Sequence, residues 1–253
     1  TDDPRGAYGG EDSDHACGVL EYVRIEFAGF EAFANNELNG LTLGGCGANS
    51  VFRHIQVHRA LDDGVEVFGG SVNLKHILVT QAADDALDWD QGWTGKVQFL
   101  ITQQTETGDN SMEGDNNAES PRAMPRSAPT LFNATLIGSR QGAQRVMTLK
   151  AGSGGTFGNI LASRHSIEFA DLRGVETQQL AQSGELAFDA VVSHDIDTVE
   201  RNEIESGGFD TTAYFADRLV TARRAAGLRP KPASQNPVAP EFVPDGTSGS
   251  IAA

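Results

Sequence analysis

Apolar and polar residues alternate in short segments that recur along the chain. Residues 62–83 align without a gap on residues 84–105, an offset of 22 residues. The aligned apolar pairs are Val65 with Leu87, Val67 with Trp89, Ile77 with Phe99, and Val79 with Ile101. Alternation with a period of two is typical of β-strands that bury one face. The pattern therefore predicts short strands that repeat about every 22 residues.

The repeat extends in both directions from these two copies. Phe52, Ile55 and Val57 lie 22 residues before Leu74, Ile77 and Val79. Glycines separate the apolar segments, as tight corners between strands require. Repeats of this kind stack equivalent side chains ~4.8 Å apart, the spacing between neighbouring strands. We therefore predict an all-β fold, a right-handed parallel β-helix (a solenoid) with rungs of about 22 residues. The ungapped register disfavours the alternative, an antiparallel sandwich.

The register also predicts which side chains fill the core. The two expected inward stacks are Ile55–Ile77–Phe99 and Val57–Val79–Ile101. Trp89 falls on an inward position. Trp93 falls at a corner, where packing against a neighbouring turn is favoured over an exposed ring that stacks on sugar.

The end of the chain departs from the strand pattern. We expect the β-helix over residues 1–209 and a helix over residues 210–227. Asp210 or Thr211 can cap the start of this helix, and Phe215 and Leu219 share one of its faces. Because the end of a β-helix exposes strand edges, the helix is a candidate cap. Residues 228–253 are rich in Pro, Ser and Gly, which predicts an extended tail or linker.

Charge and composition exclude several kinds of partner. The net charge is −16, and the sequence shows no basic face, so nucleic acid is not an expected partner. No apolar run approaches the ~20 residues that a membrane-spanning helix needs. An acidic polymer is an expected partner only where cations bridge the two.

Five segments resemble a known family: 18–29, 36–45, 62–70, 84–93 and 108–117. They are similar to uncharacterised bacterial exported proteins, often envelope lipoproteins, with a pectin-lyase-like parallel β-helix. The resemblance covers roughly residues 5–170. It implies the fold and an extracytoplasmic location (secreted, periplasmic or outer-surface). The family has no established activity, so the resemblance implies no catalytic residue.

Acidic residues form outward columns in the predicted register. Glu66, Asp88 and Glu113 fall in one column on successive rungs, and Asp90 and Asp115 fall in a second column two residues along. No Lys or Arg of the repeat occupies an outward position between them. Stacked carboxylates repel one another, which raises their pKa values or recruits a cation. Oxygen-rich clusters suit Ca²⁺, so these five residues are the predicted metal site.

Other interpretations of the acidic residues stay open. The corner pairs Asp62–Asp63 and Asp84–Asp85 are expected to cap turns through backbone hydrogen bonds, and the outward columns can be solvated carboxylates. We expect a non-catalytic envelope scaffold for surface interaction, calcium-stabilised, with carbohydrate or another envelope protein as the partner. The alternative is a carbohydrate-active enzyme, a polysaccharide lyase or glycoside hydrolase, that uses an acidic outer sheet.

His54 and His76, and the two cysteines, carry the remaining expectations. The histidines lie one rung apart and are expected to point outward, as a solvated or hydrogen-bonded pair rather than a zinc or copper site. Register places Cys17 in the rung next to Cys46, three residues from the position directly opposite. We predict a disulfide between them, which an exported protein allows. Two buried free thiols are the alternative.

Overall fold

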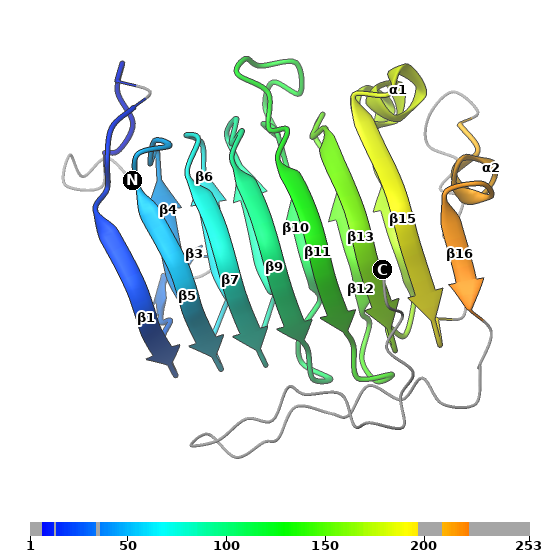
Figure 1. Ribbon diagram of the computed structural model, residues 1–253, viewed down its shortest axis with the longest axis horizontal. Helices are drawn as coiled ribbons and strands as arrows, with labels where there is room; N and C mark the ends of the chain where they lie inside the picture. Colours follow the sequence, from blue (N-terminus) through cyan, green and yellow to red (C-terminus); the bar gives the residue numbers. More distant parts are fainter. Residues whose placement is uncertain (1–6, 13, 34–35, 197–208, 223–253) are drawn as a thin grey trace.

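Two parallel sheets form the body of the protein, which a computed structural model describes over residues 7–12, 14–33, 36–196 and 209–222. Figure 1 shows the strands stacked side by side along the long axis. The eight strands of the large sheet are, in spatial order, β1 (Val19–Glu26), β5 (Val51–His58), β7 (Asn73–Thr80), β9 (Lys96–Gln103), β11 (Thr130–Ile137), β13 (Gly155–Ser163), β15 (Leu186–His194) and β16 (Leu219–Ala222). The small sheet contains β4 (Leu41–Gly44), β6 (Val65–Phe68), β8 (Leu87–Asp90), β10 (Asn110–Gly114), β12 (Arg145–Leu149) and β14 (Glu168–Leu172).

Successive turns of the chain alternate between these sheets, so that each strand pairs in parallel with the equivalent strand of the next rung. This arrangement confirms the predicted parallel β-helix. A short antiparallel pair, β2 (Glu31–Phe33) and β3 (Asn36–Glu37), lies outside both sheets. Two helices, α1 (Val175–Ser183) and α2 (Thr211–Phe215), complete the described elements.

A residue in the left-handed conformation bends most strands of the large sheet. Its φ lies between 50° and 65° in seven strands, at Tyr22, His54, His76, Phe99, Asn133, Asn159 and Ala190. The bend shifts the alternation by one residue: in β7, Leu74 and Ile77 are both buried although they are three residues apart. One long strand therefore lines two walls of the core.

The 22-residue register holds in the small sheet but changes in the large sheet after β7. Val65 pairs with Leu87 and Val67 with Trp89, as predicted. In the large sheet, however, Ile77 pairs with Leu100 and Val79 with Thr102, an offset of 23. The corner between β8 and β9 contains one more residue than the corner before it, and this insertion shifts β9 by one position.

The predicted inward positions of Phe99 and Ile101 are therefore wrong. Phe99 is 40% exposed, whereas Leu100 is 1% exposed. The stacks of Ile55 on Ile77 and of Val57 on Val79 are confirmed. Both tryptophans are fully buried, and Trp93 donates from Nε1 to the carbonyl oxygen of Val72 at 3.0 Å.

The predicted helix over residues 210–227 is also wrong in its length. Asp210 caps it by accepting a hydrogen bond from the Ala213 N–H at 2.9 Å, but the helix ends at Phe215. Leu219–Ala222 forms β16 instead, which pairs with β15 and extends the large sheet by one strand. Residues 223–227 and the predicted tail at 228–253 lie outside the described residues.

The expected cap at this end of the core is nevertheless present. Phe215, on α2, is 1% exposed and packs against Phe188 and Phe169, with ring centroids 4.9 and 5.5 Å apart. The second helix, α1, interrupts the region that we predicted to be β-helix throughout. It follows β14, and its Leu180 and Ala181 are buried.

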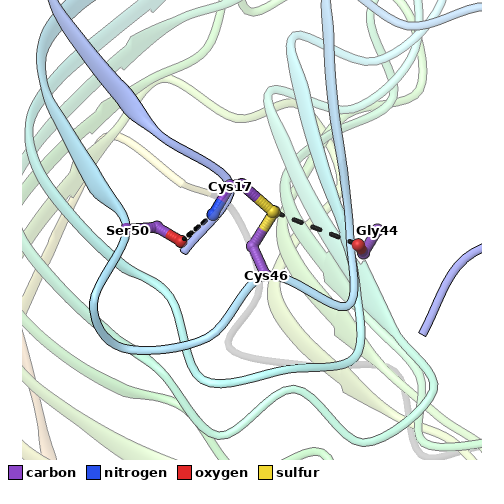
Figure 2. Close-up of a disulfide and its surroundings, with 4 residues drawn as sticks. All are labelled: Cys17, Gly44, Cys46 and Ser50. Atoms are coloured by element: carbon purple, nitrogen blue, oxygen red, sulfur yellow. Dashed lines mark hydrogen bonds between the residues drawn. A yellow bond between two sulfur atoms is a disulfide. The ribbon is translucent and has the colours of Figure 1, made fainter. Parts of the chain in front are cut away.

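The predicted disulfide is confirmed. Cys17 and Cys46 are bonded, with their Cα atoms 5.5 Å apart (Figure 2). The backbone N–H of Cys17 also donates to Ser50 Oγ at 2.9 Å. These contacts hold the segment before β1 against the corner between β4 and β5.

Candidate functional site

The outer face of the small sheet carries the acidic columns. Glu66 on β6 pairs directly with Asp88 on β8, and the pairing of Leu87 with Met112 sets Glu113 on β10 beside Asp88. The first predicted column is therefore correct. Asp90 ends β8, and Asp115 directly follows β10, so they form the second column as expected.

Two further carboxylates join the first column from the corners. Candidate ligand atoms lie within 4.8 Å of one another in a group of Asp63, Glu66 and Asp88, and in a second group of Asp85, Asp88 and Glu113. Asp88 belongs to both groups. We call these five residues the carboxylate cluster. Asp90 and Asp115 belong to no such group among the described residues, so that part of the predicted metal site is not brought together.

Asp63 and Asp85 also cap the corners as predicted. Asp63 Oδ1 accepts from the Asp85 N–H at 2.9 Å, and Asp85 Oδ1 accepts from the Asn110 N–H at 2.6 Å. These bonds repeat from rung to rung and hold the carboxylates at 6% and 4% exposure. The sequence predicted this capping but did not show that Asp63 and Asp85 also belong to the carboxylate cluster. The signal was their position in each repeat, three residues before Glu66 and Asp88 respectively.

Burial makes the charged form of these carboxylates unfavourable. Burial, reinforced by the charge of Glu66, raises the pKa of Asp63 to about 9. Burial also raises the pKa of Glu66 to about 7, against the hydrogen bond from Asn39. The pKa values of Asp85 and Asp88 lie well above the ordinary value, because the surrounding chain shields both from water, Asp85 buried and Asp88 half-buried, and both face neighbouring carboxylates. The cluster therefore holds protons at pH values where an exposed carboxylate is ionised.

Cationic side chains flank one end of the cluster, contrary to prediction. Lys150 Nζ, just after β12, lies 2.5 Å from Glu113 Oε2 and 3.8 Å from Asp115 Oδ1. Although burial opposes it, the hydrogen bond and charge of Glu113 raise the pKa of Lys150. Arg145, at the start of β12, pairs with Glu168 at 2.7 Å.

The other end of the cluster has no such compensation. In the described part of the chain, no ion pair reaches Asp63, Glu66 or Asp88. Glu66 accepts a hydrogen bond from Asn39 Nδ2, and Asp88 Oδ1 accepts one from the Trp89 N–H at 2.5 Å. Neutral donors therefore bind some of the carboxylate oxygens. The negative charge at this end can be neutralised by protons or by an added cation.

The histidines do not supply a second site. His54 and His76 point outward from the large sheet as expected, with ring centroids 4.4 Å apart in a stack that Tyr22 and Phe99 extend. They stack on neighbouring rings, and no group of three candidate metal ligands among the described residues includes them. His165 is 1% exposed, and its Nε2 lies 2.8 Å from Ser111 Oγ, so it faces the core rather than a substrate.

A family model described as the pectate-lyase-like beta helix domain matches residues 2–229. The chain belongs to this family. The match agrees with the resemblance to pectin-lyase-like β-helices seen in the sequence. No curated protein and no solved structure matched the chain. The longest helix of this pectate-lyase-like β-helix in the described ranges has nine residues, and none of its helices can cross a bilayer.

Proposed function

We propose that this pectate-lyase-like β-helix is a non-catalytic, extracytoplasmic scaffold whose carboxylate cluster binds calcium. Its partner is carbohydrate or another envelope protein. One observation carries the proposal: five carboxylates from three successive rungs converge on the outer face of the small sheet. Two of them are buried and three are half-buried, and among the described residues only Glu113 of the five has an ion pair. A bound divalent cation is a direct way to compensate such charges.

The donor set suits calcium better than magnesium. Ca²⁺ takes six to eight oxygen ligands in flexible geometry, and carboxylates bind it through one or both oxygens. Asp88 shares a group with carboxylates of the rung before it and of the rung after it. An ion at Asp88 would therefore connect β6, β8 and β10 and oppose their separation. Magnesium, which requires near-ideal octahedral geometry, fits such a crowded set less well.

The disulfide supports the extracytoplasmic location. Cys17 and Cys46 account for both cysteines of the chain, and disulfides persist in oxidising compartments. Calcium is also held by extracellular modules at affinities in the range of ~10⁻⁴–10⁻³ M. A structural calcium site and a structural disulfide are therefore consistent with the same compartment.

Calcium binding by isothermal titration tests the proposal. We expect calcium to bind the wild-type chain and Asp88→Asn to weaken binding about tenfold or more, because Asp88 belongs to both carboxylate groups. Asp189→Asn is the matched control, because Asp189 lies on β15, away from the cluster, and is exposed. Equal affinity in the Asp88 and Asp189 variants, or no calcium binding by the wild type, would show that the cluster is not the site.

The enzyme alternative rests on the acidic outer sheet and on the analogy of fold, and Lys150 is a basic residue beside these carboxylates. A general base must lose its proton near the operating pH, whereas the raised pKa of Lys150 keeps this amine charged. This argues against Lys150 as the base of a lyase. The scaffold proposal predicts no turnover of acidic or neutral polysaccharides, with or without calcium, in an assay for reducing ends and unsaturated products. Turnover that Asp88→Asn abolishes would replace the scaffold proposal with a carbohydrate-active enzyme.

A further inference from the structure

A pocket of about 760 Å³ lies where the N-terminal segment meets the corners that follow β4, β6 and β8. Tyr8 holds this segment against all three rungs. Its ring packs on Gly44, where a Cβ would lie 2.8 Å from Tyr8 Cγ, and its hydroxyl donates to Gln91 Oε1 at 2.8 Å. The ring of Phe68, on the rung between them, has its centroid 6.0 Å away. The pocket therefore spans the corners of three rungs, roughly 10 Å at ~4.8 Å per rung.

Two aromatic rings form one wall of this pocket. Tyr8 is 52% exposed although its hydroxyl is hydrogen-bonded, so its ring is fixed in orientation and open to a ligand. Phe68 is half-buried beside it, with the two ring planes tilted by 49°. The amide of Gln91 and the hydroxyl of Thr94 line the same pocket. An apolar wall with a few neutral polar groups suits a ligand ring that has an apolar face and a hydroxylated edge, such as a sugar.

The carboxylates of the pocket have no cationic partner. Glu11 and Asp12 line it, and no Lys or Arg is among the described residues that do. Both are exposed, and no ion pair within the described ranges reaches either of them. Asp12 Oδ1 accepts from the Asp14 N–H at 3.0 Å, which holds this carboxylate in place. The two side chains are therefore available to a cationic ligand.

The surroundings reinforce this negative charge. Burial, and then the charges of Asp90 and Glu66, raise the pKa of the Tyr8 phenol, so the acidic columns act on the aromatic wall. The chain as a whole carries a net charge of −16. A uronate sugar would be repelled here. A cationic ligand, by contrast, is attracted both by the carboxylates and by the faces of the aromatic rings.

We propose that this pocket binds an oligosaccharide of amino sugars. The apolar face of one sugar ring lies on Tyr8 and Phe68, and its ammonium group lies toward Glu11 and Asp12. The extent of the pocket over three rungs fits a short oligomer better than a single small cation. The inference rests on the proposed function for one point, that the partner is carbohydrate, and it names the chemical class of that carbohydrate.

Isothermal titration with four trimers tests this inference. At about pH 7, where an amine of ordinary pKa is mostly protonated, we expect the glucosamine trimer to bind. Its N-acetylated form keeps the sugar rings but lacks the charge, and trilysine keeps the charge but has no sugar ring. Each of these two should bind at least about tenfold more weakly. A galacturonate trimer should not bind, because its charge has the same sign as that of the pocket.

Substitutions in the pocket separate the two parts of the recognition. Tyr8→Ala should weaken binding of the glucosamine trimer about tenfold or more, whereas Tyr8→Phe, which keeps the ring, should retain most of the affinity. The double variant Glu11→Gln/Asp12→Asn should bind the glucosamine trimer and its N-acetylated form equally. Tyr22→Ala is the matched control, because Tyr22 is an exposed tyrosine on β1 that does not line the pocket. Thermal melts check that each variant remains folded.

Three results would overturn the inference. They are no binding of the glucosamine trimer by the wild type, equal or tighter binding of the N-acetylated trimer or of trilysine, and an equal loss in Tyr8→Ala and Tyr22→Ala. All sugar titrations contain chelator, so they are independent of calcium. Tyr8→Ala should still bind calcium, and Asp88→Asn should still bind the glucosamine trimer. Failure of this inference is therefore distinguishable from failure of the proposed calcium site.

Discussion

In calcium-free buffer, the protein should become more stable as the pH falls from about 8.5 to about 6.5. Most acidic groups in proteins have the opposite effect. Here the folded pKa values are raised, to about 7 for Glu66 and about 9 for Asp63, so the folded state binds more protons than the unfolded state in this window. Stability therefore falls as the pH rises through these values.

The size of this effect follows from the thermodynamic linkage between proton binding and folding. One extra proton held by the folded state over two pH units contributes about 2.7 kcal/mol, since each unit corresponds to ~1.36 kcal/mol. In a protein of this size the melting temperature should rise by roughly 5 °C or more. Below about pH 6.5 His165 opposes this trend, because burial lowers its pKa to about 3 and the unfolded state then binds a proton that the folded state does not.

Calcium should reverse the dependence of the protein's stability on pH. The ion replaces the protons, so its affinity rises with pH, and the gain in melting temperature should be larger at pH ~8.5 than at pH ~6.5. At a hundredfold excess over Kd the ion contributes ~2.7 kcal/mol. Differential scanning calorimetry with chelator and with calcium at both pH values measures this. Asp88→Asn should reduce both effects, whereas Asp189→Asn should reduce neither. Identical melting curves with chelator and calcium at both pH values would contradict the proposal.

Leu100→Ala should destabilise the fold by about 2–5 kcal/mol, whereas Phe99→Ala should cost less than about 1 kcal/mol. Leu100 is 1% exposed and pairs with Ile77 in the core, so its truncation leaves a cavity. Phe99 is 40% exposed and contacts His76 and Lys75 on the outer surface. Free energies of unfolding from urea denaturation measure both changes. A larger loss for Phe99→Ala would restore the uniform 22-residue register and contradict the register described here.

Phe99 and Leu100 show the limit of prediction from the sequence. The repeat predicted the fold and most inward positions because apolar residues alternate clearly in β5–β8. Phe99, Leu100 and Ile101 are three consecutive apolar residues, so alternation alone does not fix which of them face inward. The insertion before β9 decides the phase. The helix α1 was missed because Thr177 and Gln178 are among its buried residues, which gives it no apolar stripe.

Only part of the candidate site was predicted, because the prediction depended on the register of the repeat. Glu66, Asp88 and Glu113 followed from the register of the repeat, which holds in the small sheet. Lys150 was missed because it belongs to the rung after the polar loop, which has no simple offset from the preceding rungs: Glu113 pairs with Thr148, 35 residues later. Asp63 and Asp85 were assigned one role, capping, although a corner carboxylate can cap a turn and face a ligand at once.

The central claim is that calcium binds at the carboxylate cluster, and anomalous scattering from a calcium-soaked crystal tests it most directly. We expect an anomalous peak on the outer face of the small sheet, with carboxylate oxygens of Asp88 and of at least one adjacent rung at ~2.3–2.6 Å. The peak should be absent from crystals of Asp88→Asn. An ordered calcium ion elsewhere with this face empty, or protonated carboxylates without any ion at saturating calcium and pH ~8.5, would contradict the account.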